Sequence, residues 1–143
     1  MAGIKERRKK IQEHLEELQD AITLGIERRP ATIGFHAVAC ATEMLEFYLH
    51  LKGVISTGKT IKHNWFKRPK DGQKSLPLIE RKLPAVFPEK EKVYNLIYSL
   101  EENRNLLVYG KSSRTQTELV VSEFNKLRVI LEGKINEEGE SLE

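Results

Sequence analysis

The chain has 143 residues, 31% of them charged and 39% hydrophobic, which fits a single water-soluble domain around one hydrophobic core. Its formal net charge of +3 is too small to indicate a class of partner. The single cysteine, Cys40, excludes an internal disulfide, and the chain shows neither a secretory leader nor a membrane-spanning apolar run, so we expect a cytoplasmic protein.

Four amphipathic helices are predicted along the chain. The first begins at Ile4, carries apolar residues at steps of three, four and seven, and ends near residues 29–30. Pro30 can then open a second, strongly apolar helix over residues 31–52. A third helix is predicted over residues 89–108 and a fourth over residues 115–131.

These elements predict an all-α four-helix bundle with a long basic loop between helices 2 and 3. Residues 1–133 are expected to form one domain, and residues 134–143 an acidic, disordered tail. Basic residues gather at residues 5–10 and again over residues 59–74, where there are six basic residues and one acidic residue. The richness in Lys, Glu, Arg and Ile, with few Gln and Cys, is typical of proteins from thermophiles.

The stretch GVISTGKT, residues 53–60, fits the letters of a phosphate-binding loop. Such a loop needs a strand before it and a helix directly after it, because backbone N–H groups and the helix N-terminus surround the phosphates. Here the preceding residues have a helical pattern, and Pro69, Gly72 and Pro77 prevent a long helix afterwards. We therefore interpret Gly53 as a left-handed cap that ends the second helix.

The basic loop combines aromatic and cationic side chains. Aromatic faces stack on unpaired bases while cations offset phosphate charge, so this composition suits RNA or single-stranded nucleic acid. The alternative is a solvated basic loop whose aromatic residues anchor it to the bundle. The residues expected to hold an RNA strand are Lys62, Trp65, Lys67, Arg68 and Lys70.

Two regions resemble the HEPN family. The second helix has Phe35-His36-Ala37 near its start, Glu43 at its centre and Leu51-Lys52-Gly53 at its end, and His63 follows after a short turn. Farther on, Arg104-Asn105 is similar to the start of the HEPN motif Arg-Asn-x-x-x-His. The resemblance implies a four-helix bundle, often a homodimer, in a family with many metal-independent RNA-cleaving enzymes and RNA-linked toxins of toxin–antitoxin pairs.

One position departs from the HEPN motif, because Tyr109 stands where the family carries its catalytic His. The resemblance implies that Arg104 would stabilise the phosphate-centred transition state, Asn105 would orient the phosphate or the motif, and Tyr109 would replace the base. Proton transfer is harder for tyrosine, whose unperturbed pKa is near 10. Two interpretations therefore stay open: a ribonuclease with an altered motif, and a non-catalytic module that binds a nucleotidyltransferase-type protein, as some HEPN domains do.

The stretch EMLEFYLH, residues 43–50, is also similar to the ribonuclease III signature E-R-L-E-F-L-G-D. That enzyme holds magnesium with several carboxylates and processes RNA by hydrolysis. Here His50 replaces the final Asp, and no second acidic pair is evident. Glu43 and Glu46 share one helix face, so a magnesium site is the alternative to a protein without a cofactor. Both resemblances point to RNA as the partner.

Overall fold

The computed structural model describes residues 3–56 and 58–143, and its regular elements there are all helical. The all-α class is therefore confirmed. None of the helices in these two ranges combines the length and apolarity needed to cross a lipid bilayer. The elements are α1 (Ile4–Leu24), α2 (Pro30–Leu51), the 3-10 turn η1 (His63–Trp65), α3 (Leu78–Lys82), α4 (Lys90–Tyr109) and α5 (Arg114–Glu137).

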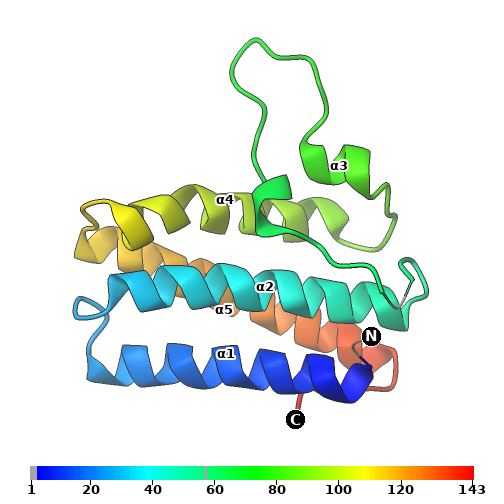
Figure 1. Ribbon diagram of the computed structural model, residues 1–143, viewed down its shortest axis with the longest axis horizontal. Helices are drawn as coiled ribbons and strands as arrows, with labels where there is room; N and C mark the ends of the chain where they lie inside the picture. The colour runs from blue at the N-terminus through cyan, green and yellow to red at the C-terminus, as the bar shows by residue number, and fades with distance from the viewer. Residues whose placement is uncertain (1–2, 57) are drawn as a thin grey trace.

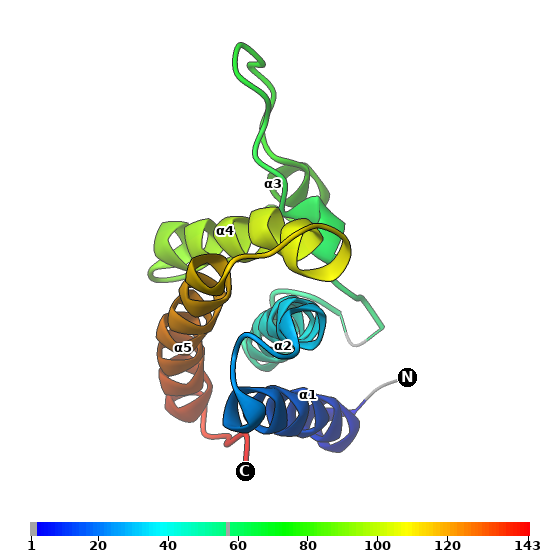
Figure 2. The ribbon, with the colours of Figure 1, turned by 90° about the vertical axis from the view of Figure 1, so that its left-hand side faces the viewer.

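Helix α2 lies at the centre of the molecule (Figure 2). Helices α1, α4 and α5 each pack against it and enclose it on three sides. Most of its residues from Ile33 to Leu49 are buried, as expected for a helix that is apolar nearly all round. The segment that follows α2 in the chain lies along its fourth side, and the candidate site is formed where this segment meets α2 and α4.

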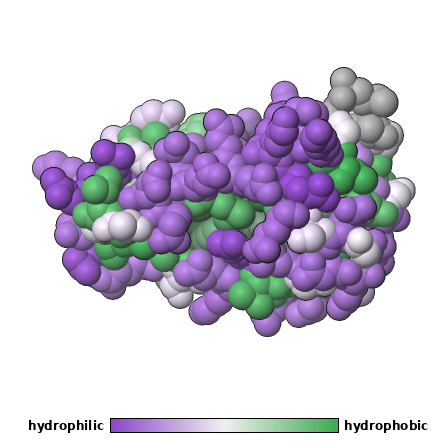
Figure 3. Space-filling model, turned by 90° about the horizontal axis from the view of Figure 1, so that it is seen from below, coloured by the Kyte–Doolittle hydropathy of each residue, from purple (hydrophilic) through white to green (hydrophobic). Residues whose placement is uncertain are grey.

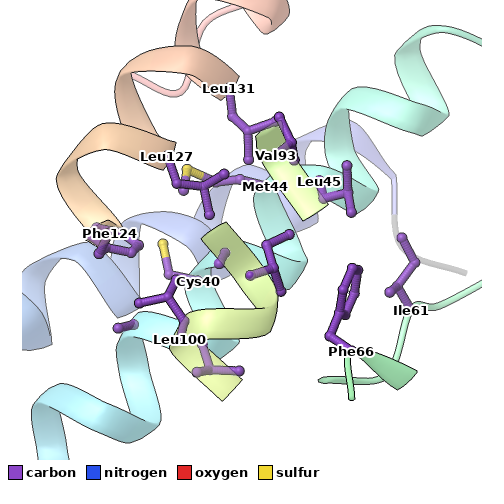
Figure 4. Close-up of a cluster of buried hydrophobic side chains, with 14 of the residues drawn as sticks. Cys40, Met44, Leu45, Ile61, Phe66, Val93, Leu100, Phe124, Leu127 and Leu131 are labelled. Carbon is purple, nitrogen blue, oxygen red and sulfur yellow. The ribbon is translucent and has the colours of Figure 1, made fainter. Parts of the chain in front are cut away.

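The core joins three helices to that segment (Figure 4). Side chains of α2, α4 and α5 point towards one another, and the loop adds side chains of its own from beside η1. Burial of these large apolar groups supplies most of the favourable free energy of folding. The labelled members are Cys40, Met44, Leu45, Ile61, Phe66, Val93, Leu100, Phe124, Leu127 and Leu131.

Two glycines set helix ends. Helix α1 stops at Leu24, earlier than the predicted residues 29–30, because Gly25 adopts φ +116° and its N–H donates to the Ile22 carbonyl. Helix α2 stops at Leu51, and Gly53 takes the left-handed conformation with φ +75°, as predicted. Within the GVISTGKT stretch Thr57 lies outside the described residues, as do residues 1–2 of the expected domain. The next helical element after the stretch is only the short η1 turn.

The connection between α2 and α4 was expected to be one long loop, but it contains the helical turns η1 and α3. Between these two turns an extended loop projects away from α4 (Figure 1). Phe66 anchors the base of this loop, because its ring is fully buried against Tyr94 and Tyr98 of α4. The sequence left two interpretations of the aromatic residues in this loop: they contact RNA, or they anchor the loop to the bundle. Phe66 is an anchor.

Helix α5 continues past the expected domain end at residue 133. It runs to Glu137, after a start fixed by a capping box between Ser113 and Gln116. The last residues then lie against α1: Arg8 donates to the Ser141 carbonyl at 2.7 Å, and Gln12 donates to the Leu142 carbonyl at 2.9 Å. On the side of the molecule opposite the projecting loop, the surface is mostly hydrophilic with hydrophobic side chains in separate patches (Figure 3).

Candidate functional site

A cavity of about 270 Å³ lies where α2 and α4 meet residues 61–64, which belong to the segment that runs back along α2 and is called the returning loop below. Its wall on α2 is mainly apolar, with Phe35, Val38 and Ala39 beside the polar Thr42 and Glu43. The other walls bring in polar groups from parts of the chain that are distant in sequence. These groups are Lys62, His63 and Asn64 from the loop and Arg104 from α4.

His63 is held in one orientation by a buried carboxylate. Its Nδ1 lies 2.9 Å and 3.1 Å from the two carboxylate oxygens of Glu101, whose residue is only 4% exposed. Because a carboxylate only accepts, Nδ1 carries the hydrogen and donates it, so the lone pair of the neutral ring is at Nε2. Burial raises the pKa of Glu101, while the hydrogen bond and the charge of His63 act against this rise. In the described ranges Nε2 has no hydrogen-bond partner, so it is available to a substrate.

Arg104 supplies the positive charge of this cavity on the α4 side. Its guanidinium carbon lies 5.7 Å from the centre of the Phe35 ring, which holds the side chain by a cation–π contact. Across the two described ranges the guanidinium has no hydrogen bond or ion pair with the protein. Its donors are therefore free for an anionic ligand, and the planar fork of an arginine suits phosphate oxygens.

Glu43 lines the same cavity, in surroundings that disfavour the charged form of its carboxyl. Its pKa is raised, chiefly by burial and then by the negative charge of Glu46, although Lys10 and Arg7 partly offset the shift. One of its oxygens, Oε2, is buried without a hydrogen-bond partner in the described structure. A carboxyl in such surroundings can hold a proton and release it to a reacting group.

Glu46 has a structural role, one helical turn from Glu43. It is buried, forms an ion pair with Arg7 of α1, and accepts a hydrogen bond of 2.6 Å from the backbone N–H of Ile61. The second contact ties the returning loop to α2 directly beside Lys62 and His63. Both carboxylate oxygens of Glu46 are thus engaged by the protein.

The alternative magnesium site at Glu43 and Glu46 has few ligands available. Within the described ranges no group of three or more His, Cys, Asp and Glu side chains lies close enough together to hold a metal ion. Glu46 would have to leave Arg7 and Ile61 to bind one. The two carboxyl groups are neighbours, as the sequence indicated. The geometry, however, favours a Glu43 carboxyl beside the buried Glu46–Arg7 ion pair over a metal site.

A second cavity of about 270 Å³ lies between the loop and α4, and Glu101 is part of its lining. It is lined by Lys67 and Arg68 of the loop and by Glu102 and Asn105 of α4. Arg68 forms an ion pair with Glu102, and its side chain is still 45% exposed. Asn105, predicted to act beside Arg104, therefore opens into this second cavity, together with two of the cations expected to hold RNA.

The remaining predicted residues lie outside both cavities. Tyr109 is 78% exposed at the end of α4. It is five residues beyond Arg104, which places it about 140° away around the helix axis. Trp65 is partly buried against the core, and Lys70 starts a turn of the projecting loop that Gln73 closes. The structure thus places Lys62 and Arg104 at the first cavity and Asn105, Lys67 and Arg68 at the second, and it leaves Tyr109, Trp65 and Lys70 outside both.

Comparison with protein-family models, curated proteins and solved structures gave no match.

His63 and Glu101 had no predicted catalytic or binding role from the sequence. His63 was visible as a histidine after the second helix, among lysines and aromatic residues. Its partner Glu101 is 38 residues away along the chain, so only the packing of η1 on α4 brings the two side chains together. Two positions could have drawn attention to this pair: His63 directly follows Lys62, and Glu101 lies about one helical turn before Arg104.

Proposed function

We propose that this protein binds RNA and cleaves its phosphodiester bonds without a metal ion, at the cavity between α2, α4 and the returning loop. The observation that carries the proposal is the pair of His63 and the buried Glu101, placed in the same cavity as the unpaired guanidinium of Arg104. A base held by a carboxylate, next to a phosphate-binding cation, is what RNA cleavage through the 2′-hydroxyl requires.

In the proposed reaction, Nε2 of His63 accepts the proton of a ribose 2′-hydroxyl. The 2′-oxygen attacks the adjacent phosphorus, and the bond from phosphorus to the 5′-oxygen breaks. Arg104 stabilises the negative charge that gathers on the phosphate oxygens in the transition state. The carboxyl of Glu43 protonates the leaving 5′-oxygen, and the products are a 2′,3′-cyclic phosphate and a 5′-hydroxyl end. Glu101 is a positioning residue that fixes the tautomer and the orientation of His63.

This assignment changes the role that the HEPN resemblance suggested for Tyr109. The bundle is still proposed to be HEPN-like, with Arg104 and Asn105 at the positions that the family motif implies. The base, however, comes from the loop after α2 instead of from the end of α4. Lys62, Lys67 and Arg68 would hold the phosphates of the strand, so binding should weaken as salt concentration rises.

The test is cleavage of a mixture of single-stranded and structured RNA by the purified protein, in EDTA and separately with magnesium. We expect cleavage in EDTA, lowered about 100-fold or more by His63→Ala and by Arg104→Ala. Glu101→Gln should lower the rate less and should shift the pH profile, because it alters the orientation and charge partner of His63. Arg28→Ala removes an exposed arginine that lines neither the first nor the second cavity and is the matched control.

Cleavage that survives Arg104→Ala would remove the proposed role of this site and would point to a contaminating nuclease. Cleavage only with magnesium would favour the ribonuclease III-like alternative at Glu43 and Glu46. If no RNA is cleaved under either condition, the catalytic part of the proposal fails.

A second candidate function is a non-catalytic interaction module. Leu106 and Tyr109 are both exposed and lie three residues apart on α4, so they form an apolar pair on the surface. Such a pair suits a homodimer interface or a nucleotidyltransferase-type protein partner. Light scattering of the wild type and of the Leu106→Ser, Tyr109→Ser double variant tests the homodimer. A monomer in both samples would contradict it.

A further inference from the structure

A third cavity, of about 370 Å³, lies beside α4 near the start of α3. The first two cavities adjoin residues 101–105 of α4, whereas this one adjoins residues 90–98. Its lining includes Leu76 and Pro77 before α3, Glu80 of α3, and Tyr94, Asn95 and Tyr98 of α4. Apolar and aromatic walls with a few polar groups are typical of sites for small organic ligands.

Tyr94 contributes a hydroxyl that the protein does not satisfy. The residue is 2% exposed, and its ring packs between Phe66 and Phe87 at centre-to-centre distances of 5.3 Å and 5.8 Å. Its hydroxyl is buried and has no hydrogen-bond partner in the described structure. Burial raises the pKa of this tyrosine, so the hydroxyl keeps its hydrogen and is a donor. A buried donor without a partner is costly, and a ligand with an acceptor would relieve that cost.

Polar groups at the edge of the cavity add recognition. The side-chain amide of Asn95 is exposed and has no hydrogen bond within the described ranges, so its carbonyl and its NH₂ group are both available. An amide of this kind can donate and accept at once along the edge of a nucleobase. Glu80 and Lys90 form an ion pair of 2.8 Å on another part of the wall.

Arg68 connects this cavity to the second cavity. It lines the second cavity, and its guanidinium carbon also lies 5.4 Å from the centre of the Tyr98 ring in the third. One of its nitrogens is 3.5 Å from the backbone carbonyl of Asn95. With one face of the guanidinium on Tyr98 and the side chain 45% exposed, the other face is open to stack on a base.

We infer that the third cavity binds a nucleobase of an RNA strand whose scissile phosphate lies at Arg104. From Arg104 to Asn95 the helix rises about 14 Å, a distance that a few nucleotides of extended strand can cover. The base enters between α3 and α4, Asn95 pairs with its polar edge, and Arg68 stacks on its face. This inference rests on the proposed function for the identity of the strand, but the nucleobase site can be tested without any cleavage.

The first experiment titrates the wild-type chain with AMP, GMP, CMP and UMP, and follows the ring signals of Tyr94 and Tyr98 by NMR. At least one nucleotide should shift these signals with a saturable dependence on concentration. Asn95→Ala should weaken binding about tenfold, as expected for loss of a bidentate contact to a base. Tyr94→Phe should weaken binding about fivefold, because it removes one hydrogen bond.

Tyr94→Phe also provides a test that a merely structural tyrosine would not pass. Removal of an unsatisfied hydroxyl should leave the free protein as stable as the wild type or more stable, while it weakens nucleotide binding. Tyr48→Phe, which changes a buried tyrosine of α2 outside this cavity, is the matched control and should leave binding unchanged.

His63→Ala separates this inference from the proposed function. If that variant loses cleavage and still binds the nucleotide with the wild-type affinity, both proposals are supported. If the wild type binds a nucleotide at Tyr94 and Tyr98 but cleaves no RNA, the nucleobase site stands and the cleavage proposal fails. If none of the four nucleotides shifts the two tyrosines, or if Asn95→Ala leaves binding unchanged, the nucleobase site is overturned.

Discussion

Glu46 shows how a single buried charge connects three parts of this molecule. Glu46 is a residue of α2. Its carboxylate pairs with Arg7 of α1 and accepts a hydrogen bond from the N–H of Ile61 in the returning loop. Two residues of the basic segment 5–10 are consequently engaged in the fold, since Arg7 binds Glu46 and Arg8 binds the C-terminal residues. The remaining lysines of that segment are exposed and stay available to solvent or to phosphate.

We predict that Glu46→Ala lowers the free energy of unfolding by about 3–5 kcal/mol, because it removes the buried carboxylate that pairs with Arg7 and accepts the N–H of Ile61. Glu46→Gln should cost less, because the amide oxygen can still accept from Ile61. Urea denaturation followed by circular dichroism measures both variants. Glu17→Gln, on an exposed position of α1, is the control and should change little. Equal losses for Glu46→Ala and Glu17→Gln would contradict a structural ion pair.

Glu43 predicts a pH dependence of stability. Its pKa is raised in the folded protein from the ordinary value of 4.5, so the folded state holds the proton more tightly than the unfolded state. The stability from this group is complete below pH 4.5 and is lost as pH rises through the folded pKa. Glu101 contributes with the same sign, because its pKa is also raised.

The Glu43→Gln variant removes one of these two contributions. It should be more stable than the wild type at pH 7 and should show a smaller fall in the free energy of unfolding between pH 5 and pH 8. Urea titrations at several pH values measure this slope, with Glu17→Gln as the control again. An unchanged slope in Glu43→Gln would show that this carboxyl ionises as freely in the folded chain as in the unfolded one.

At the scale of the helices, Gly34 fixes how closely α2 and α4 approach. A Cβ built at this position would lie 2.7 Å from Cβ of Leu107, an atom attached directly to the α4 backbone. The same point is 3.6 Å from the carbonyl oxygen of Arg104. The absence of a side chain at Gly34 therefore lets α4 sit against α2 at the place where Phe35 and Arg104 form one end of the cavity.

We predict that Gly34→Ala destabilises the protein by about 1–3 kcal/mol through overpacking, in spite of the better helix propensity of alanine. Gly133→Ala is the matched variant, since it lies inside α5 and the added Cβ would meet no atom within 4 Å outside its chain neighbours and the backbone of its own helix. That substitution should stabilise the chain by about 0.5–1 kcal/mol. Thermal unfolding of both variants measures the difference, and a stabilising Gly34→Ala would show that α2 and α4 separate at little cost.

The helices could be predicted because their signals are local. Hydrophobic periodicity indicated each long helix, and Pro30 and Gly53 indicated the limits of α2. The end of α1 was predicted too late, because Ile26 continues the apolar period beyond Gly25, where the chain turns. In the long connection, η1 and α3 are too short to show a period of their own.

The full candidate site could not be predicted from the sequence, because it is formed by contacts between residues that are far apart along the chain. Arg104 and Glu43 were found through motifs on helices, and the structure does bring them to one cavity. Their relation to His63 depends on the return of the loop along α2, which the Ile61–Glu46 hydrogen bond and the burial of Phe66 determine. These are pairings between residues distant in sequence, so spacing along the chain could not reveal them.

For the whole molecule, the C-terminal residues close the arrangement around α2. Helices α1 and α5 both pack on α2, and residues after α5 then reach α1 through Arg8 and Gln12. Leu142 is 5% exposed and belongs to the hydrophobic core. Glu140 in the acidic end of the chain thus pairs with Arg8 in the basic segment 5–10, and the C-terminal residues keep α1 in place opposite the projecting basic loop.

We predict that Leu142→Ala lowers the free energy of unfolding by about 2 kcal/mol, at the low end for a core leucine because a terminal segment can readjust. Arg8→Ala should add little to this loss, because both changes release the same segment. Leu119→Ala, at an exposed leucine of α5, is the control and should be nearly neutral. Amide hydrogen exchange in Leu142→Ala should accelerate most in α1, whose contact with the C-terminal residues is lost. Unchanged exchange in α1, or a Leu142→Ala variant as stable as Leu119→Ala, would show that α1 is held by α2 alone.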